Sequence, residues 1–186
     1  MPNTWTNHLQ SVHQFAWQVL DAAANSKQIE QGLVTLATIG PNGPEARAVV
    51  MRQSDRSLAT VAIYTDSATP KVDEINRDNR VAVMRWCARH SLQIRLTGTA
   101  TVLTGKAVAN TWDTLAPAQR ENYGVTPVPG QAIPAQDAYE RVAIPDRFAV
   151  ILITVAQMDV VHLGQTPHVR AAFEQSDDWR GRWLAP

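Results

Sequence analysis

The sequence predicts a mainly β protein, a closed antiparallel barrel with helices at its periphery. Three observations support this expectation. At least six short apolar or alternating segments recur along the chain, and turn residues such as Gly40-Pro41-Asn42-Gly43 separate them. Helical spacing is confined to the start of the chain and to connections between these segments. The length of 186 residues favours a single domain over 1–186, with an N-terminal helix and a C-terminal strand extension.

The elements follow from hydrophobic periodicity and turn chemistry. A helix is expected from Asn3 to about Asn25, with Asn3 or Thr4 as its N-cap. Gly98, inside the clearest alternating strand, predicts a bend or bulge. The expected strands are 33–39, 47–52, 61–65, 80–86, 92–103 and 148–155, with 158–163 as the hairpin partner of the last. Further helical segments are expected at 69–75, 105–115 and 135–142.

Composition narrows the class of protein. The formal net charge is zero, so there is no electrostatic footprint for nucleic acid or an anionic membrane, and neither partner is expected. The single cysteine, Cys87, excludes an internal disulfide framework and a multi-cysteine zinc site. His8 and His13 are five apart and lie on different helix faces, so no metal site is predicted. We find no signal peptide and no apolar run long enough for a membrane span, which favours a cytoplasmic protein.

One stretch, Arg47-Ala48-Val49-Val50-Met51-Arg52, has a cation at each end of an apolar strand. Both faces are apolar in the middle, so both are expected to be covered, either by the fold or by a partner. The arginines could hold an anionic group or could be solvated at the rims of a core strand. Lys71 raises the same alternatives, because Thr69 and Pro70 mark a helix N-cap and first turn. A lysine there opposes the helix dipole, whereas a bound anion would be stabilised by it.

These segments, in order and spacing, resemble the pyridoxamine 5′-phosphate oxidase family. The matching motifs are Arg47-Ala48-Val49-Val50-Met51-Arg52, Ile63-Tyr64-Thr65-Asp66, Lys71 with Glu74-Ile75, Val81-Ala82-Val83, Gln93-Ile94-Arg95-Leu96-Thr97-Gly98 and the terminal Trp183-Leu184-Ala185-Pro186. The similarity is good over about residues 32–104. It implies a six-stranded split β-barrel, a homodimer, and FMN bound at the dimer interface.

The resemblance also implies roles for individual residues. Arg47 and Lys71 would hold the FMN phosphate, with Thr65 and Thr69 close by. Residues Ala48, Val49, Val50 and Met51 belong to the strand along the flavin, Tyr64 would lie beside the ring system, and Gln93 would hydrogen-bond it. Arg52 takes the place of a lysine that contacts the substrate phosphate, and His168 and Arg170 of the tail would contact the substrate as well.

The sequence departs from the family pattern at several positions. Pro70 replaces a common second basic residue, and Gln131 is the one candidate for a Gln-Ser pair that reaches FMN from the other subunit. His162 stands near the position of a tryptophan, and His168-Val169-Arg170 replaces the Arg-Leu-His motif that grips the pyridoxal substrate. FMN binding is therefore supported better than pyridoxamine phosphate as the substrate.

Two functional classes remain open. One is an FMN-dependent oxidoreductase acting on a small anionic substrate, for which Arg52, His168 and Arg170 supply anion-binding groups. The other is a flavin-binding module without turnover, serving storage, sensing or interaction, which the altered tail motif favours. No catalytic residue is predicted, because a flavin carries the chemistry itself.

Overall fold

A computed structural model of the protein describes residues 4–164 and 166–186. The strands that form the barrel are β1 (Leu33–Gly40), β2 (Gly43–Asp55), β3 (Thr60–Asp66), β4 (Arg80–Cys87), β5 (Leu92–Thr104) and β8 (Phe148–His162). Two strands, β9 (Val169–Glu174) and β10 (Arg182–Leu184), continue the sheet beyond β8, and β6 (Val125–Thr126) pairs separately with β7 (Glu140–Arg141).

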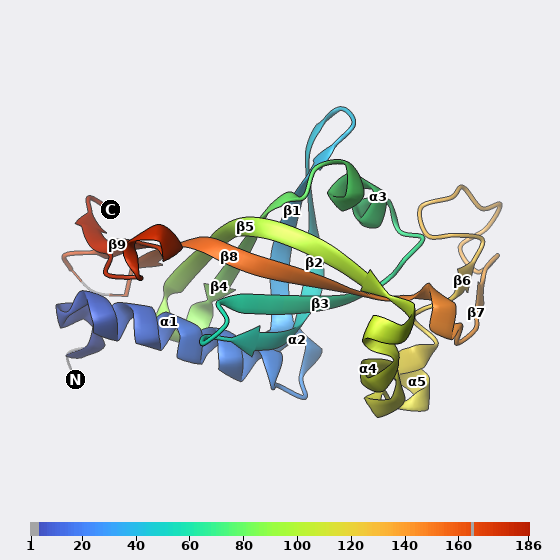
Figure 1. Cartoon of the computed structure of the whole chain (residues 1–186), viewed down its shortest axis with the longest axis horizontal. Coiled ribbons are helices and arrows are strands. Elements are labelled where there is room, and N and C mark those ends of the chain that lie inside the picture. Colours follow the sequence, from blue (N-terminus) through green and yellow to red (C-terminus); the bar gives the residue numbers. More distant parts are fainter. Residues whose placement is uncertain (1–3, 165) are drawn as a thin grey trace.

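The main sheet of the described residues has the order β10-β9-β8-β3-β2-β1-β4-β5, and all its pairings are antiparallel. Strand β8 also pairs with β5, so six strands close into a barrel while β9 and β10 extend from β8 (Figure 1). The expected mainly β fold with a closed six-stranded antiparallel barrel is confirmed. Closure removes the unpaired strand edges that an open sheet would expose.

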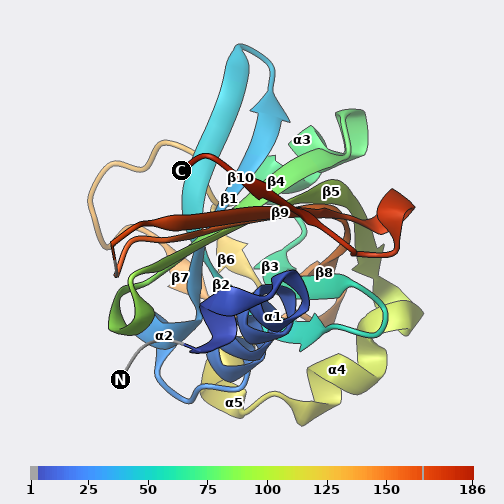
Figure 2. The ribbon, with the colours of Figure 1, turned by 90° about the vertical axis from the view of Figure 1, so that its left-hand side faces the viewer.

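Helices lie around the barrel rather than in a separate layer. The α-helices are α1 (Leu9–Ala24), α2 (Ile29–Gly32), α3 (Pro70–Arg77), α4 (Ala109–Thr114) and α5 (Pro117–Arg120). The 3-10 helices are η1 (Thr4–Asn7), η2 (Ala88–His90), η3 (Gly105–Val108), η4 (Pro145–Arg147) and η5 (Gln175–Asp177). Seen from one end, α1 is viewed nearly along its axis beneath β9, and the β1–β2 hairpin projects away from it (Figure 2).

Helix α1 closes the core because its apolar residues recur at helical spacing on one face. Val12, Ala16 and Leu20 of this face are at most 1% exposed, and they join the side chains that point inward from the barrel strands. A second cluster around Phe148 and Trp112 fills the other end, under α4.

Several sequence-based expectations need correction. The first helix begins at Leu9 with His8 as its N-cap, because residues Thr4–Asn7 form a 3-10 turn; Asn3 lies outside the described residues. The polar segment after Arg52 continues strand β2 to Asp55, and the turn follows it. Residues 135–142 contain no helix, and their end forms β7.

The predicted hairpin between 148–155 and 158–163 is also wrong, because β8 runs without a break from Phe148 to His162. Its length is matched to β5, which it pairs over its whole course. The predicted bulge at Gly98 is confirmed by a register shift between Thr97 and Gly98. A Cβ at Gly98 would lie 1.9 Å from the carbonyl oxygen of Thr154, so only glycine permits this strand contact.

The arginine strand is not covered on both faces within this chain. Met51 is buried in the core, but Ala48 is exposed and Val50 is half-buried. Ala48 lies opposite Thr35, which in turn lies opposite Met84. We call this surface the outer sheet face and define it by Leu33, Thr35, Ala48, Val50, Met84 and Trp86. Leu33 is 40% and Trp86 46% exposed, so this face presents apolar side chains to the exterior of the chain.

Candidate functional site

A pocket of about 380 Å³ lies between strands β2 and β3 and the start of α3. Such a volume falls in the range of about 300–1,000 Å³ typical of small-molecule sites. We call it the β2–β3 pocket. Seven predicted site residues line it: Val49, Val50, Arg52, Tyr64, Thr65, Thr69 and Lys71. Four of these come from the end of β3 and from the segment leading into α3, where the sequence predicts a helix start.

The local sequence explains this end of the pocket. Thr69 is the N-cap of α3 and Pro70 occupies its first turn, as predicted. The Thr69 hydroxyl donates a hydrogen bond to the carbonyl oxygen of Asp66 at 2.7 Å and lies 3.3 Å from the Thr65 hydroxyl oxygen. The Lys71 ammonium donates to the Thr65 hydroxyl at 3.1 Å. We call Lys71, Thr65 and Thr69 the Lys71 cluster.

Lys71 is a half-buried cation whose described contacts include no carboxylate. Burial lowers the pKa of Lys71, and the Arg47 guanidinium lowers it further, while Asp66 and Glu74 raise it. A cation removed from water and bonded to hydroxyls alone fits an oxyanion such as a phosphate. The observation is one of charge and hydrogen bonding, independent of the sequence resemblance.

Arg47 lies beside the pocket but does not line it. Its Nη2 donates to the Glu74 carboxylate at 2.8 Å, and its Nη1 donates to the Thr38 hydroxyl. Thr38 in turn donates to the same Glu74 oxygen at 2.5 Å. We call Arg47, Thr38 and Glu74 the Arg47 staple, because it ties β1 and β2 to α3.

A second ion pair holds the turn between β3 and α3. Asp66 is 4% exposed, and it accepts hydrogen bonds from Arg147 Nε and Nη2 at 2.7 and 2.8 Å. It also accepts from the backbone N–H of Ala68 and of Gly124, each at 2.9 Å. This network anchors the segment after α5, which supplies Asn122, Tyr123 and Pro129 to the pocket. These three residues carry no local sequence signal, because their contact with the pocket depends on a pairing across 58 positions.

Two tyrosines border the pocket. Gln53 donates a hydrogen bond to the Tyr64 hydroxyl oxygen at 3.0 Å. Burial raises the pKa of Tyr64 and of Tyr123, although Arg52 opposes the shift in both. Both hydroxyls are therefore protonated at neutral pH and can donate hydrogen bonds.

The remaining predicted residues lie elsewhere in the chain. Met51 is 1% exposed, so its side chain belongs to the core. Gln93 lies on β5 between Trp86 of β4 and Val161 of β8, and His168 is exposed just before β9. Neither these residues nor Ala48 and Arg170 line the β2–β3 pocket.

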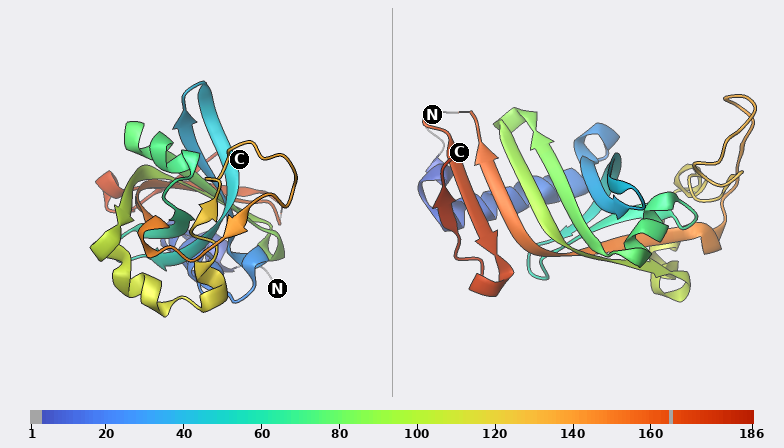
Figure 3. Two further views of the ribbon diagram at one scale, coloured as in Figure 1. Left: turned by 90° about the vertical axis from the view of Figure 1, so that its right-hand side faces the viewer. Right: turned by 90° about the horizontal axis from the view of Figure 1, so that it is seen from above.

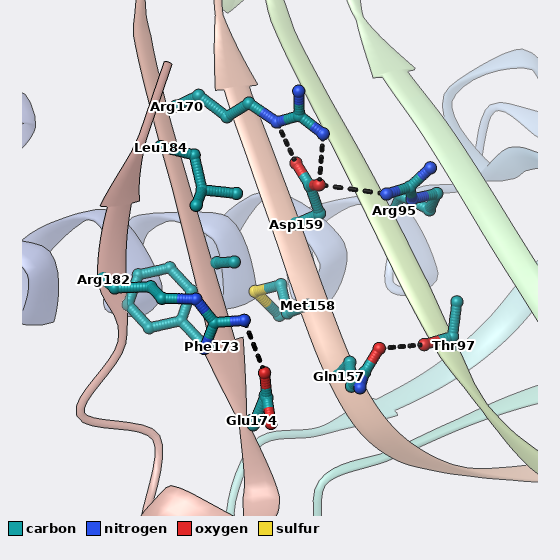
Figure 4. A pocket seen from close by; sticks show the side chains of 11 residues that line it. Arg95, Thr97, Gln157, Met158, Asp159, Arg170, Phe173, Glu174, Arg182 and Leu184 are labelled. Carbon is teal, nitrogen blue, oxygen red and sulfur yellow. Dashed lines mark hydrogen bonds and ion pairs between the residues drawn. The ribbon is translucent and has the colours of Figure 1, made fainter. Parts of the chain in front are cut away.

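Arg170 lines a separate pocket of about 300 Å³ on the outside of β5, β8, β9 and β10, which we call the β9 pocket (Figure 4). Its Nε and Nη2 bind the two carboxylate oxygens of Asp159 at 3.2 and 2.8 Å. Arg95 reaches the same carboxylate at 3.0 Å. Two guanidinium groups thus share one carboxylate in this pocket.

The fold defines a class of closed six-stranded antiparallel barrels, and the β2–β3 pocket of this barrel lies beside the start of α3. Comparison with known proteins gives the family. The protein-family model described as pyridoxamine 5′-phosphate oxidase, FMN-binding domain, matches residues 5–104, so the chain belongs to this family. FMN is the cofactor of this domain.

Relatives agree at the level of fold and family. A pyridoxine/pyridoxamine 5′-phosphate oxidase from Microcystis aeruginosa is 32% identical over 83 residues, which are 44% of this chain and 38% of that protein. The match therefore spans less than half of the relative's length.

Two solved structures share the fold. A pyridoxamine 5′-phosphate oxidase-related, FMN-binding protein from Nostoc punctiforme has a TM-score of 0.73 at 23% identity, over 89% of this chain and 93% of that one. PhzG from Burkholderia lata, in complex with tetrahydrophenazine-1-carboxylic acid, has a TM-score of 0.73 at 16% identity, over 100% and 98% of the two chains. No helix within residues 4–164 and 166–186 has the length and hydrophobicity needed to span a membrane.

Proposed function

We propose that this protein is an FMN-dependent oxidoreductase that acts on a small anionic substrate. The observation that carries the proposal is the half-buried Lys71 at the end of the β2–β3 pocket, hydrogen-bonded to Thr65 and without a carboxylate partner among the described residues, in a chain that matches an FMN-binding domain. A ligand phosphate would supply the negative charge that Lys71 lacks.

In this proposal the Lys71 cluster holds the FMN phosphate. The start of α3 adds the positive end of the helix dipole. Arg47 does not line the pocket, and both of its terminal nitrogens are engaged in the Arg47 staple. Val49, Val50 and Tyr64 would then lie along the ring system.

The bound FMN would supply a ring that accepts a hydride from the substrate. The chain would supply orientation and charge. Arg52, which lines the pocket and has no ion-pair partner among the described residues, would bind the anionic group of the substrate. The protonated Tyr64 and Tyr123 would donate hydrogen bonds to ligand oxygens in the same pocket.

We further propose a homodimer with FMN at the interface. The support is twofold: the outer sheet face is apolar and exposed, and the predicted contacts of Gln93, His168 and Arg170 lie outside the β2–β3 pocket of their own chain. A second copy packed on the outer sheet face would cover Ala48 and bring a partner's β5 and β9 residues toward the flavin.

The binding experiment is a titration of the apoprotein with FMN and with riboflavin, followed by quenching of flavin fluorescence. FMN is expected to bind more tightly, because riboflavin lacks the phosphate that the Lys71 cluster would hold. Equal affinity for the two flavins would refute the phosphate site.

The catalytic experiment exposes FMN-loaded protein to candidate donors and monitors bleaching of the flavin. We expect little or no turnover of pyridoxamine phosphate under air, measured as pyridoxal phosphate and peroxide, because His168-Val169-Arg170 differs from the family motif. Turnover near 1 s⁻¹, the low end of typical enzymes at about 1–10³ s⁻¹, would show that this tail accepts the pyridoxal ring.

A second candidate function is a flavin-binding module without turnover. It is favoured by the pairing of Arg170 with both oxygens of Asp159, which leaves that guanidinium already engaged. The same bleaching assay separates the two, since a module without turnover would bind FMN tightly and remain oxidised with every donor.

A further inference from the structure

The charges around the Lys71 cluster divide into two neutral pairs and one cation. Asp66 and Arg147 form one pair, with contacts of 2.7 and 2.8 Å. Glu74 and Arg47 form the other, at 2.8 Å. Lys71 donates only to a hydroxyl. Among the described residues of this group, Lys71 is therefore the cation without a carboxylate partner.

The Glu74 carboxylate is held firmly in its position. It is 6% exposed, and the Thr38 hydroxyl, 2% exposed, donates to the same carboxylate oxygen that Arg47 contacts. Glu74 also lies on α3, three residues after Lys71, and its charge acts on the Lys71 ammonium. A buried carboxylate so close to an anion site opposes anion binding, because like charges repel more strongly at low effective dielectric.

We propose that Glu74 is the counter-charge of the site: by neutralising Arg47 it limits the positive charge offered to a ligand phosphate to that of Lys71. The inference rests on the proposed function, since it concerns the same phosphate end of the pocket. Glu74 is thus a specificity-determining residue that acts by pairing with Arg47 and through the electric field of its own negative charge, without touching the flavin. It sets how strongly the site prefers FMN over riboflavin.

The experiment measures the ratio of the riboflavin and FMN dissociation constants, at one fixed pH and ionic strength, for a small set of variants. Glu74→Gln keeps the shape and the acceptor for Thr38 but removes the charge. The ratio is expected to rise by about threefold or more, equivalent to roughly 0.7 kcal/mol. A loss that is equal for both flavins would mean that Glu74 is merely structural, and would overturn the proposal.

The double variant gives the sharper result. Arg47→Met alone leaves Glu74 as an unpaired buried anion, so the ratio is expected to fall. Arg47→Met combined with Glu74→Gln removes both charges, and the ratio should return to within about twofold of the wild-type value, as expected for coupled charges. If the double variant stays as low as Arg47→Met, Arg47 contacts the phosphate directly and the counter-charge proposal is wrong.

One control and one fallback complete the design. Asp177→Asn removes one negative charge at an exposed position of η5, and its ratio should match the wild type. A rise equal to that of Glu74→Gln would make the effect one of net charge and overturn the proposal. Should Glu74→Gln not fold, as judged by circular dichroism, the double variant carries the test, because removing both partners of a buried pair is tolerated better than removing one.

Failure of the proposed function can be distinguished from failure of the counter-charge role of Glu74. Lys71→Met should abolish most of the preference for FMN. If it leaves the ratio unchanged, the phosphate lies elsewhere and the proposed site itself is wrong, whatever Glu74 does. If Lys71→Met acts as expected while the Glu74 variants do not, only the counter-charge role is refuted.

Discussion

His13 links a single buried side chain to the pH dependence of stability. It is 3% exposed, its Nε2 accepts a hydrogen bond from Trp17 Nε1 at 3.0 Å, and its Nδ1 has no partner among the described atoms. Its ring stacks on Trp179 at 5.3 Å, joining α1 to the C-terminal segment. Burial lowers the pKa of His13 from 6.5 to about 4, and the positive charge of Arg56 acts in the same direction.

Because the folded-state pKa lies below the unfolded value, the fold favours neutral His13. This contribution to the free energy of unfolding is complete above pH 6.5 and is lost as the pH falls toward about 4. Its full size is on the order of 3 kcal/mol. The free energy of unfolding, measured by urea titration, should fall less between pH 7 and pH 5 in His13→Gln than in the wild type. His8→Gln, at an exposed position, should behave as the wild type; equal pH dependence in all three would contradict the assignment.

Lys71 should make FMN affinity pH-dependent if it holds the phosphate as proposed. Only the ammonium form would bind a phosphate, and burial lowers the pKa of Lys71 in the empty site, so affinity should begin to fall at a lower pH than an ordinary lysine would allow. Lys71→Ala should weaken FMN binding by about 1.5–3 kcal/mol, the range for hydrogen bonds to charged groups. Lys71→Arg should retain FMN binding, and its FMN affinity should not decline at alkaline pH. FMN titrations across pH measure both. If FMN affinity declines identically in Lys71→Arg, another group causes the decline.

The residues of the Lys71 cluster could be predicted from sequence because they are local: Thr69-Pro70-Lys71 marks a helix start by itself. Glu74 was recognised only as part of a motif, since its pairing with Arg47 joins α3 to β2 across 27 positions. Tyr123 could not be found for the same reason. The helix start is confirmed because its signal is contained within one turn.

At the scale of elements, the segment from α5 to η4 depends on one glycine. Gly124 has φ of 142° and donates its N–H to Asp66, and a Cβ there would lie 1.9 Å from the carbonyl oxygen of Val142. In Figure 3 the chain after Gly124 forms the long loop at the end of the barrel away from both termini. The pocket wall around Tyr123 therefore rests on a backbone conformation that only glycine adopts without strain.

Gly124→Ala should lower the free energy of unfolding by more than about 2 kcal/mol, because both backbone strain and a steric clash oppose it. Gly43→Ala is the matched control: its φ is 136°, but nothing lies within 4 Å of the added Cβ. It should cost less, about the 1–2 kcal/mol of an unfavourable backbone region alone. Urea denaturation of both variants measures the difference, and equal losses would mean that the clash with Val142 is relieved by loop movement.

The element predictions succeeded where alternation and turn residues coincide, as in β1 through β5. They failed at β8, where Ala156-Gln157 after a continuous apolar run looked like a turn. The strand continues there because β5 offers an equally long partner, and this pairing cannot be read from local sequence. The N-cap of α1 was misplaced for a smaller reason, since Thr4–Asn7 satisfies helical spacing as a 3-10 turn.

At the scale of the whole molecule, the distribution of polar and apolar surface supports the proposed homodimer. The predicted flavin and substrate residues separate into the β2–β3 pocket and the β9 side of the sheet, and the outer sheet face presents exposed Leu33 and Trp86. Such a face costs free energy in water unless it is covered. Dimerisation would cover it and complete the site in one step.

Light scattering should therefore give a mass of twice 20.5 kDa for the FMN-loaded wild type. Ala48→Glu places a charge at the exposed centre of β2, where a partner would pack, so it should shift the mass to that of the monomer and weaken FMN binding together. Ala107→Glu makes the same change at an exposed position of η3, away from the outer sheet face, and should remain dimeric with unchanged affinity. A wild-type protein that binds FMN as a 20.5 kDa monomer would show that one chain completes the site alone. In that case Gln93 and Arg170 would have to act on something other than the flavin.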